Sequence, residues 1–260
     1  MSNVYSWKHV LLLAALMTLL VVKPLVCGFA AQPLWFEVAY SLVVATSIVL
    51  LSQTAKQRVA TLFIGLPALA AMWAVHFAAE PFHHGSLMAG HLARIVFLAY
   101  AAGNILEGIF RRPSVSIDSL FGAVCAYLLI GVAWGAAYSL VETAHPGSFY
   151  ADDATAAAIE DESLREPVLI YYSFITLTTV GYGDITPLSS AARTLTWLEA
   201  MTGQFYIGVL VAALVGLRIT QAHMRGASAH APGSSELAVG EAIPDVAAVA
   251  SADRPSIQSR

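Results

Sequence analysis

Six stretches of the chain are nearly free of charge and long enough to cross a membrane, and this pattern constrains the fold most strongly. They lie approximately at 10–30, 34–52, 58–79, 86–110, 118–142 and 190–218. A helix needs roughly 20 mostly apolar residues to cross the hydrocarbon core of a bilayer. Only 12% of the residues are charged, against about 25% in an ordinary soluble domain. The sequence therefore predicts an all-α membrane protein with six transmembrane helices.

A seventh apolar stretch, residues 167–178, is too short to cross and suits a re-entrant helix. This stretch leads into a polar segment, and residues 176–187, where the two meet, read TLTTVGYGDITP. Irregular backbone at membrane depth is tolerated only where it is buried in protein or lines a watery path. Gly181 and Gly183 alternate with bulkier residues, and their backbone freedom lets successive carbonyl groups point the same way. A row of such carbonyl oxygens can replace the water shell of a cation.

Residues 178–184, TTVGYGD, resemble the selectivity filter of the potassium channel family. The surrounding order of outer helix, turret, pore helix, filter and inner helix is similar to the two-helix pore module of bacterial six-transmembrane-helix channels. The inner stretch LEAMTGQFYIGVLVAALVG also looks like that of bacterial channels of this group. The resemblance covers about residues 118–218 and implies a homotetramer, because one strand of carbonyl groups cannot encircle an ion.

The resemblance assigns the ion-binding groups to the backbone. Potassium would be bound by the carbonyl oxygens of Thr179, Val180, Gly181 and Tyr182, and the Thr179 hydroxyl would add the innermost ligand. Gly183 would close the strand at the outer mouth. No cofactor is implied, because K⁺ is the permeant ion.

The resemblance also implies residues that support the filter from behind. We expect Tyr171 to form a hydrogen bond with Asp184 and Tyr172 to pack on Tyr182. Thr178, the first residue of the motif, is expected to belong to the same support.

The last apolar stretch would line the cavity and carry the gate. Gly203 lies 20 residues after Gly183, where the family often has a hinge glycine, although close helix packing is an equal alternative. Gln204, Ile207 and Val211 are expected to line the cavity. Glu199, an ionisable residue inside a span, is expected behind the pore helix, bonded to its polar groups.

The chain divides by function into four parts. Residues 1–112 would form a four-helix membrane domain in the position of a voltage sensor, 113–117 a cytoplasmic linker, 118–218 the pore domain, and 219–260 a disordered cytoplasmic tail. We favour a retained helix over a signal peptide for the first span, because Lys23 and Pro24 interrupt its apolar core.

The fourth span lacks the arginine repeat of a voltage sensor. Its arginine, Arg94, is expected either to pair with Glu37 or Glu80 or to extend its charged end outward to the membrane surface. One charge crossing the whole field supplies only about 2.3 kcal/mol per 100 mV, so steep voltage gating is not expected.

The turret between the outer helix and the pore helix carries an excess of acidic residues. Six acids oppose Arg165 within about residues 145–166, and they would concentrate cations at the outer mouth or merely keep the loop soluble. They are Asp152, Asp153, Glu160, Asp161, Glu162 and Glu166.

Basic residues near the span ends predict the orientation. With the N-terminus inside, seven lysines and arginines lie at cytoplasmic ends and three at outer ends, which favours both termini in the cytoplasm. The resemblance suits a bacterial inner membrane.

The leading interpretation is a passive potassium-selective channel. A weakly selective cation channel and a subunit of a potassium-uptake transporter remain alternatives. We find no nucleophile–His–acid set, so an enzyme is not expected. The net charge of −4 gives no sign of nucleic-acid binding, and we see no soluble ligand domain.

Overall fold

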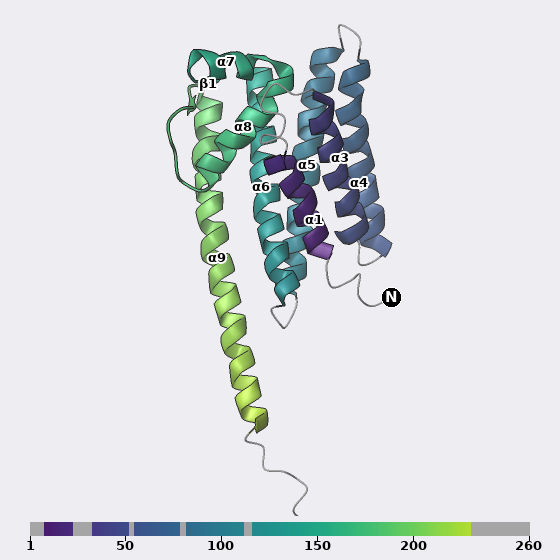
Figure 1. Ribbon diagram of the computed structural model, residues 1–260, viewed down its shortest axis with the longest axis vertical. Coiled ribbons are helices and arrows are strands. Elements are labelled where there is room, and N and C mark those ends of the chain that lie inside the picture. Colours follow the sequence, from purple (N-terminus) through teal and green to yellow (C-terminus); the bar gives the residue numbers. More distant parts are fainter. Residues whose placement is uncertain (1–7, 23–32, 52–54, 79–81, 112–115, 230–260) are drawn as a thin grey trace, which may run out of the picture. The chain divides into compact units, whose positions relative to one another are not determined.

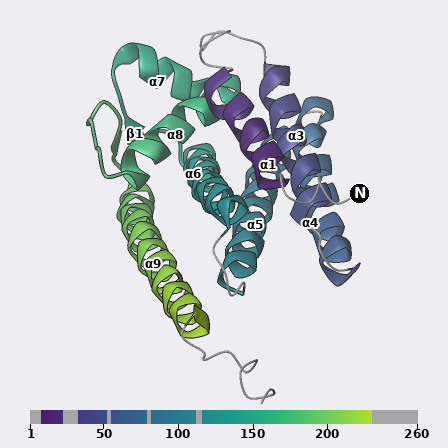
Figure 2. The same cartoon turned by 60° about the horizontal axis from the view of Figure 1, so that its bottom comes forward.

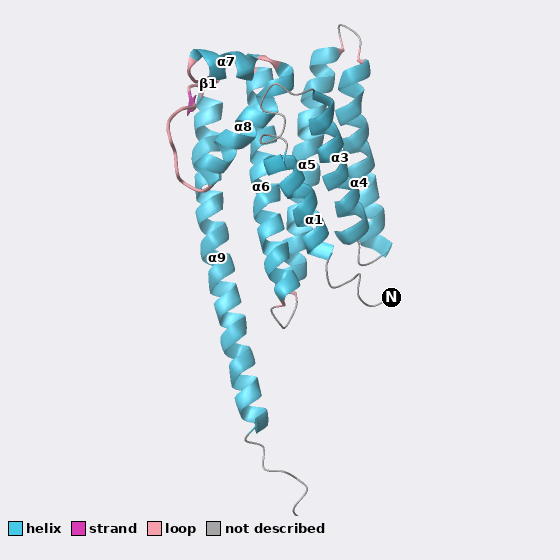
Figure 3. Cartoon of the chain, viewed as in Figure 1, coloured by secondary structure: helices cyan, strands magenta, loops and turns pink. Residues whose placement is uncertain are grey.

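The computed structural model describes residues 8–22, 33–51, 55–78, 82–111 and 116–229, which are helical almost throughout (Figure 3). The N-terminal part contains α1 (Lys8–Met17), the π-helical turn η2 (Thr18–Val22), α3 (Pro33–Leu51), α4 (Ala55–Ala74), the 3-10 turn η3 (Val75–Phe77) and α5 (His83–Phe110). The C-terminal part contains α6 (Ile117–Ala144), β1 (Phe149–Tyr150), α7 (Asp153–Glu160), α8 (Glu162–Leu177), β2 (Thr186–Pro187) and α9 (Ser190–Ala229).

Three helical stretches among the described residues are long and apolar enough to cross a bilayer. They are Gln57–Phe77, His83–Phe110 and Ile117–Ala144. The described apolar stretches of α1 and α3, His9–Val21 and Glu37–Ile48, are shorter. The part of the predicted first span that follows Val22, with Lys23 and Pro24, lies outside the described residues.

The main apolar core lies where α1, α3, α4 and α5 pack beside α6 (Figures 1 and 2). Each of these helices contributes at least one large side chain that is no more than 1% exposed: Leu12, Tyr40, Met72, Phe97 and Leu129. These helices pack through residues that recur at helical spacing, as the apolar stretches of the sequence predict.

Two glycines on α6 allow α8 to approach its backbone. An ideal Cβ on Gly131 would lie 2.6 Å from the ring of Phe174, and one on Gly135 would lie 2.8 Å from the Cα of Ile170. The hydroxyl oxygen of Ser173 lies 2.7 Å from the carbonyl oxygen of Gly131. Small residues four positions apart commonly permit such close helix contacts in membrane proteins.

The pore helix begins earlier than the predicted stretch 167–178. Asp161 caps α8 by accepting a hydrogen bond from the Ser163 amide at 2.8 Å, and the polar first turn precedes Pro167. The turret is not a plain loop, because Asp152 caps the short helix α7 in the same way through Thr155. Each cap satisfies an amide that has no partner within its helix.

The last helix is longer than the predicted inner span. α9 continues through Ala229, beyond the predicted boundary at 218, so the start of the predicted tail is helical. No proline occurs within residues 190–229, and the next proline after α9 is Pro232. The chain divides into two compact units, Met1–Ile219 and Thr220–Arg260, and residues 230–260 of the predicted disordered tail lie outside the described residues.

Candidate functional site

The TVGYG segment, residues 179–183, follows the C-terminal end of α8 directly, and hydrogen bonds attach its first residues to the last turn of that helix. The amides of Val180 and Gly181 both donate to the carbonyl of Ile175, at 2.9 and 3.3 Å. The Thr178 hydroxyl donates to the carbonyl of Phe174 at 2.6 Å. These bonds satisfy carbonyl groups of the last helical turn, so the start of the segment is fixed relative to the helix axis.

Every second residue of this segment has a positive φ. The values are +59° for Thr179, +55° for Gly181 and +79° for Gly183. The two glycines were expected from the sequence, whereas the left-handed conformation of Thr179 was not. A non-glycine residue in this region costs about 1–3 kcal/mol and such strain clusters at functional sites. The alternation is the backbone pattern that allows successive carbonyl groups to face one side.

The segment is exposed along its length within a single chain. Residues 178–184 are all exposed, and the side chains of Val180 and Tyr182 leave 51% and 71% of their surface uncovered. Both faces of the strand are therefore accessible to an ion or to another protein chain.

The hydrogen bond expected between Tyr171 and Asp184 is present. The Tyr171 hydroxyl donates to the Asp184 carboxylate at 2.7 Å. This bond joins the middle of α8 to the residue that follows Gly183, so it spans the back of the segment.

Tyr172 does not make the contact that the sequence suggested. Within the chain its ring packs edge-on against Tyr138 and Phe149, with centroids 5.0 and 5.4 Å away, and its hydroxyl lies 2.8 Å from that of Thr196. No packing of Tyr172 on Tyr182 is seen among the described residues of one chain. The observed contacts join α8 to α6, β1 and α9, so Tyr172 supports the segment indirectly.

The outer end of the segment is held by a second set of contacts, which sequence reasoning missed. β2 pairs antiparallel with β1, with Tyr150 opposite Thr186. The buried carboxylate of Glu142 accepts hydrogen bonds from the amides of Gly147 and Ser148 at 2.7 and 2.9 Å. The sequence feature that could have predicted these contacts is Glu142, an acidic residue near the end of an apolar span, with Gly147 shortly after it.

Glu199 lies behind the pore helix, as the sequence predicted. It is fully buried, and its carboxylate accepts hydrogen bonds from Ser173 on α8 and Tyr138 on α6. One side chain therefore connects the outer, pore and inner helices.

The substitution Glu199→Gln tests this connection. The amide keeps the size of the side chain but loses one acceptor oxygen, which we expect to destabilise the protein by about 1–3 kcal/mol. Thermal unfolding of the purified protein in detergent measures the loss. Tyr138→Phe is the matched variant, because it removes one donor and keeps the ring. Wild-type stability in both variants would contradict the connection.

The expected cavity residues lie on α9. Gly203 packs against the C-terminal end of α8, where an added Cβ would overlap the carbonyl oxygen of Leu177. This position favours the packing alternative over the hinge. Gln204 and Ile207 are exposed within the chain, while Val211 is helical and its side chain lies outside the described part.

Most turret acids have partners that the sequence did not reveal. Hydrogen bonds from the side chains, and then from the amides, of Thr155 and Ser163 lower the pKa of Asp152 and Asp161, respectively. Glu162 pairs with His83 at 2.9 Å, and Glu166 is buried in contact with Arg94. All the turret acids except Glu166 are exposed, so only the charge of Glu166, which is paired with Arg94, is withdrawn from the set that could attract cations.

Arg94 pairs with Glu37 at 2.9 Å, which is one of the alternatives expected from the sequence. Glu80, the other expected partner, lies outside the described residues. Within the described ranges, no group of three or more His, Cys, Asp or Glu side chains could hold a metal ion.

Comparison with known proteins finds similarity over part of the chain. A family model described as "Ion channel" matches residues 147–217, which contain α7, α8, the TVGYG segment and most of α9. The chain is also 30% identical over 104 residues to the "Two pore potassium channel c" of Oryza sativa subsp. japonica. This match covers 40% of the chain and 20% of the rice protein, so the aligned part spans a fifth of that relative.

No solved structure matches the chain. The ion channel match and the apolar helices together support an integral membrane protein that is similar to ion channels over residues 147–217.

Proposed function

We propose that four copies of this chain form a potassium-selective channel that conducts K⁺ passively across a membrane. The alternating positive φ values at Thr179, Gly181 and Gly183 carry the proposal. Carbonyl oxygens of residues 179–182, with the Thr179 hydroxyl, would replace the hydration shell of K⁺. The name of the rice relative, a potassium channel, supports the choice of ion.

The geometry of one chain supports the proposed assembly as a homotetramer. A single strand provides carbonyl oxygens on one side of an ion only, so further copies must complete the ring. Exposed apolar side chains on α9 support such contacts, among them Trp197, Met201 and Phe205, which are 53%, 44% and 63% exposed. In the assembled channel we place Gln204, Ile207 and Val211 along the cavity.

The channel would have six membrane-crossing helices per subunit and both termini in the cytoplasm, in a bacterial inner membrane. Strong voltage gating is not part of the proposal. Arg94 is buried, bonded to two carboxylates and 5.5 Å from the centre of the Tyr40 ring. Moving this one charge through the whole membrane field would break those contacts, whereas the field supplies only about 2.3 kcal/mol per 100 mV for the movement.

Flux through the purified protein in liposomes tests the proposal. We expect K⁺ efflux that exceeds Na⁺ efflux by at least about a hundredfold, which corresponds to roughly 2.7 kcal/mol of discrimination, and block by Ba²⁺. Comparable K⁺ and Na⁺ rates would indicate a weakly selective cation channel. Transport that depends on a gradient of a second solute would instead indicate an uptake system, and either result rejects the proposed function.

A further inference from the structure

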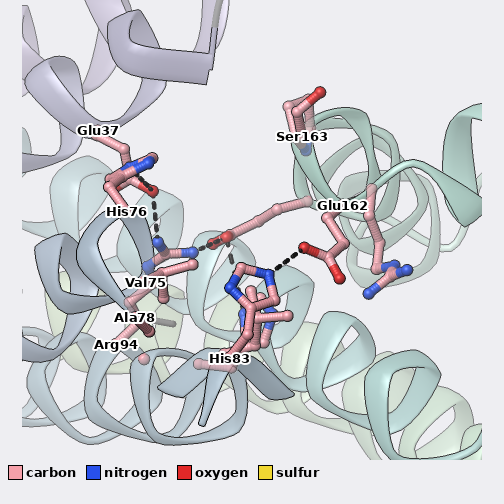
Figure 4. Close-up of a pocket in the computed structure, with 14 residues that line it drawn as sticks. Glu37, Val75, His76, Ala78, His83, Arg94, Glu162 and Ser163 are labelled. Carbon is pink, nitrogen blue, oxygen red and sulfur yellow. Dashed lines mark hydrogen bonds and ion pairs between the residues drawn. The ribbon is translucent and has the colours of Figure 1, made fainter. Parts of the chain in front are cut away.

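A polar cavity of about 370 Å³ lies where α5 faces the N-terminal half of α8 (Figure 4). α3 and η3 complete its wall with Glu37, Val75 and His76. The cavity therefore separates the N-terminal helices from the helix that leads into the TVGYG segment.

Arg94 connects the two sides of this cavity. It is 5% exposed, and its guanidinium donates to Glu37 on α3 at 2.9 Å and to Glu166 on α8. Glu166 is equally buried at 4% exposure. Buried charges are costly unless they are paired, so each of these side chains depends on the others for its position.

The other basic side chains that line the cavity do not contact Glu37 and Glu166 as closely as Arg94 does. Arg165 also lines the cavity, but its guanidinium donates to the Thr143 hydroxyl and to the carbonyls of Ile159 and Glu160. Imidazoles near the carboxylates lie farther away, with His91 at 3.8 Å from Glu166 and His76 at 3.9 Å from Glu37.

The Arg94–Glu166 contact is a direct connection between α5 and α8. The closely packed helix pairs in this region are α5 with α6 and α6 with α8, not α5 with α8. Side chains that reach across the cavity therefore join α5 to the pore helix, and the second such pair, His83 with Glu162, is partly exposed.

The pore helix can transmit a displacement from this contact to the filter. α8 has 16 residues, which makes it about 24 Å long at 1.5 Å per residue. Glu166 lies in its N-terminal half, and Thr178 and Thr179 follow its last turn. A shift or tilt at Glu166 therefore moves the carbonyl groups that begin the filter.

We propose that Arg94 is a positioning residue for the filter: through its ion pair with Glu166 it fixes the pore helix, so the N-terminal helices control the filter through α8 itself. This inference rests on the proposed channel function for its effect on ion flow. The effect on the backbone of the filter does not depend on that function.

The substitution Glu166→Gln tests the inference in the full-length protein. It removes the charge on α8 but leaves Arg94 paired with Glu37, so the fold is preserved. We expect the ratio of K⁺ to Na⁺ flux in liposomes to fall about tenfold, and Arg94→Gln to produce a similar fall. Both variants break the Arg94–Glu166 contact, and Arg94→Gln also breaks the contact with Glu37, so the double variant should be no worse than Arg94→Gln alone.

Two controls separate positioning from a general structural effect. Glu162→Gln removes an acid one turn earlier on the same helix. Its pair with His83 is open to solvent and therefore holds α8 only weakly, so the flux ratio should stay unchanged. Glu166→Asp keeps the charge and should recover most of the wild-type ratio. Equal effects of Glu162→Gln and Glu166→Gln, or additive effects of Arg94→Gln and Glu166→Gln, would overturn the inference.

Hydrogen–deuterium exchange of the amides of residues 178–183 provides a readout that needs no ion flow. We expect Glu166→Gln to raise their exchange rates about tenfold over wild type, and Glu162→Gln to leave them unchanged. Unchanged exchange in Glu166→Gln overturns the positioning role even if the wild-type protein conducts K⁺. If the wild-type protein fails to select K⁺ but the exchange responds as expected, the proposed function fails and the positioning role stands.

Discussion

Replacement of Gly203 by alanine is expected to displace the C-terminal end of α8 and to abolish selective conduction. The added Cβ would overlap the carbonyl oxygen of Leu177 and would lie 3.2 Å from the Cδ1 atom of the same residue. A backbone atom cannot move aside as the end of a flexible side chain can, and overpacking of this kind costs about 1–3 kcal/mol. Thermal unfolding of the purified protein and K⁺ flux in liposomes measure the two effects.

Gly208→Ala is the matched control for this substitution. Gly208 lies on the same helix, and a Cβ added to it would meet no atom within 4 Å in the chain. Alanine there gains about 0.5–1 kcal/mol of helix propensity over glycine, so stability should be kept or raised. A Gly203→Ala protein that keeps wild-type stability but no longer opens would contradict the packing role and support a hinge.

The helices were predictable because their signals are local. The length and position of the apolar stretches placed α3, α4, α5 and α6 within a few residues of their observed bounds, and the short apolar stretch identified the core of α8. The hydrogen bond between Tyr171 and Asp184 was also predicted. It depended on the resemblance of the motif to the potassium channel family, not on periodicity.

The contacts that join these helices were less predictable, because they depend on residues far apart in the sequence. Glu166 is 72 positions from Arg94, and composition alone made it one of six turret acids. Its position beside Pro167, at the start of an apolar helix, could have indicated that it needs a buried partner. Tyr172 was assigned to the filter by analogy, although its ring packs in an aromatic cluster on the other side of α8.

The close packing of α6 against another helix could have been predicted from two glycines in the sequence. Gly131 and Gly135 are four residues apart in an apolar span, a spacing that commonly marks a helix contact in membranes. The sequence alone does not identify the helix that packs against these two glycines. Phe174 and Ile170 of α8 do so, and this packing sets the direction in which the pore helix aims its last turn.

Replacement of Gly181 by alanine is expected to abolish selectivity for K⁺ over Na⁺, which is the largest effect we predict. Gly181 has a φ of +55°, and a left-handed backbone costs a residue with a Cβ roughly 1–2 kcal/mol. The strand can escape this strain by rotating the peptide, which turns a carbonyl away from the ion path. In a tetramer the change occurs four times around one axis. Reversal potentials in mixed K⁺ and Na⁺ solutions measure the outcome.

Gly147→Ala separates loss of the carbonyl pattern from backbone strain in general. Gly147 has a φ of +80° in the turret, and like Gly181 it has no atom within 4 Å of an added Cβ. The two substitutions therefore carry similar strain in a single chain, and both should lower stability by a similar amount. Only Gly181→Ala should change the reversal potential, because only its peptide groups are proposed to face the ion. Wild-type selectivity in Gly181→Ala would mean that the carbonyl groups of residues 179–182 do not coordinate the permeant ion.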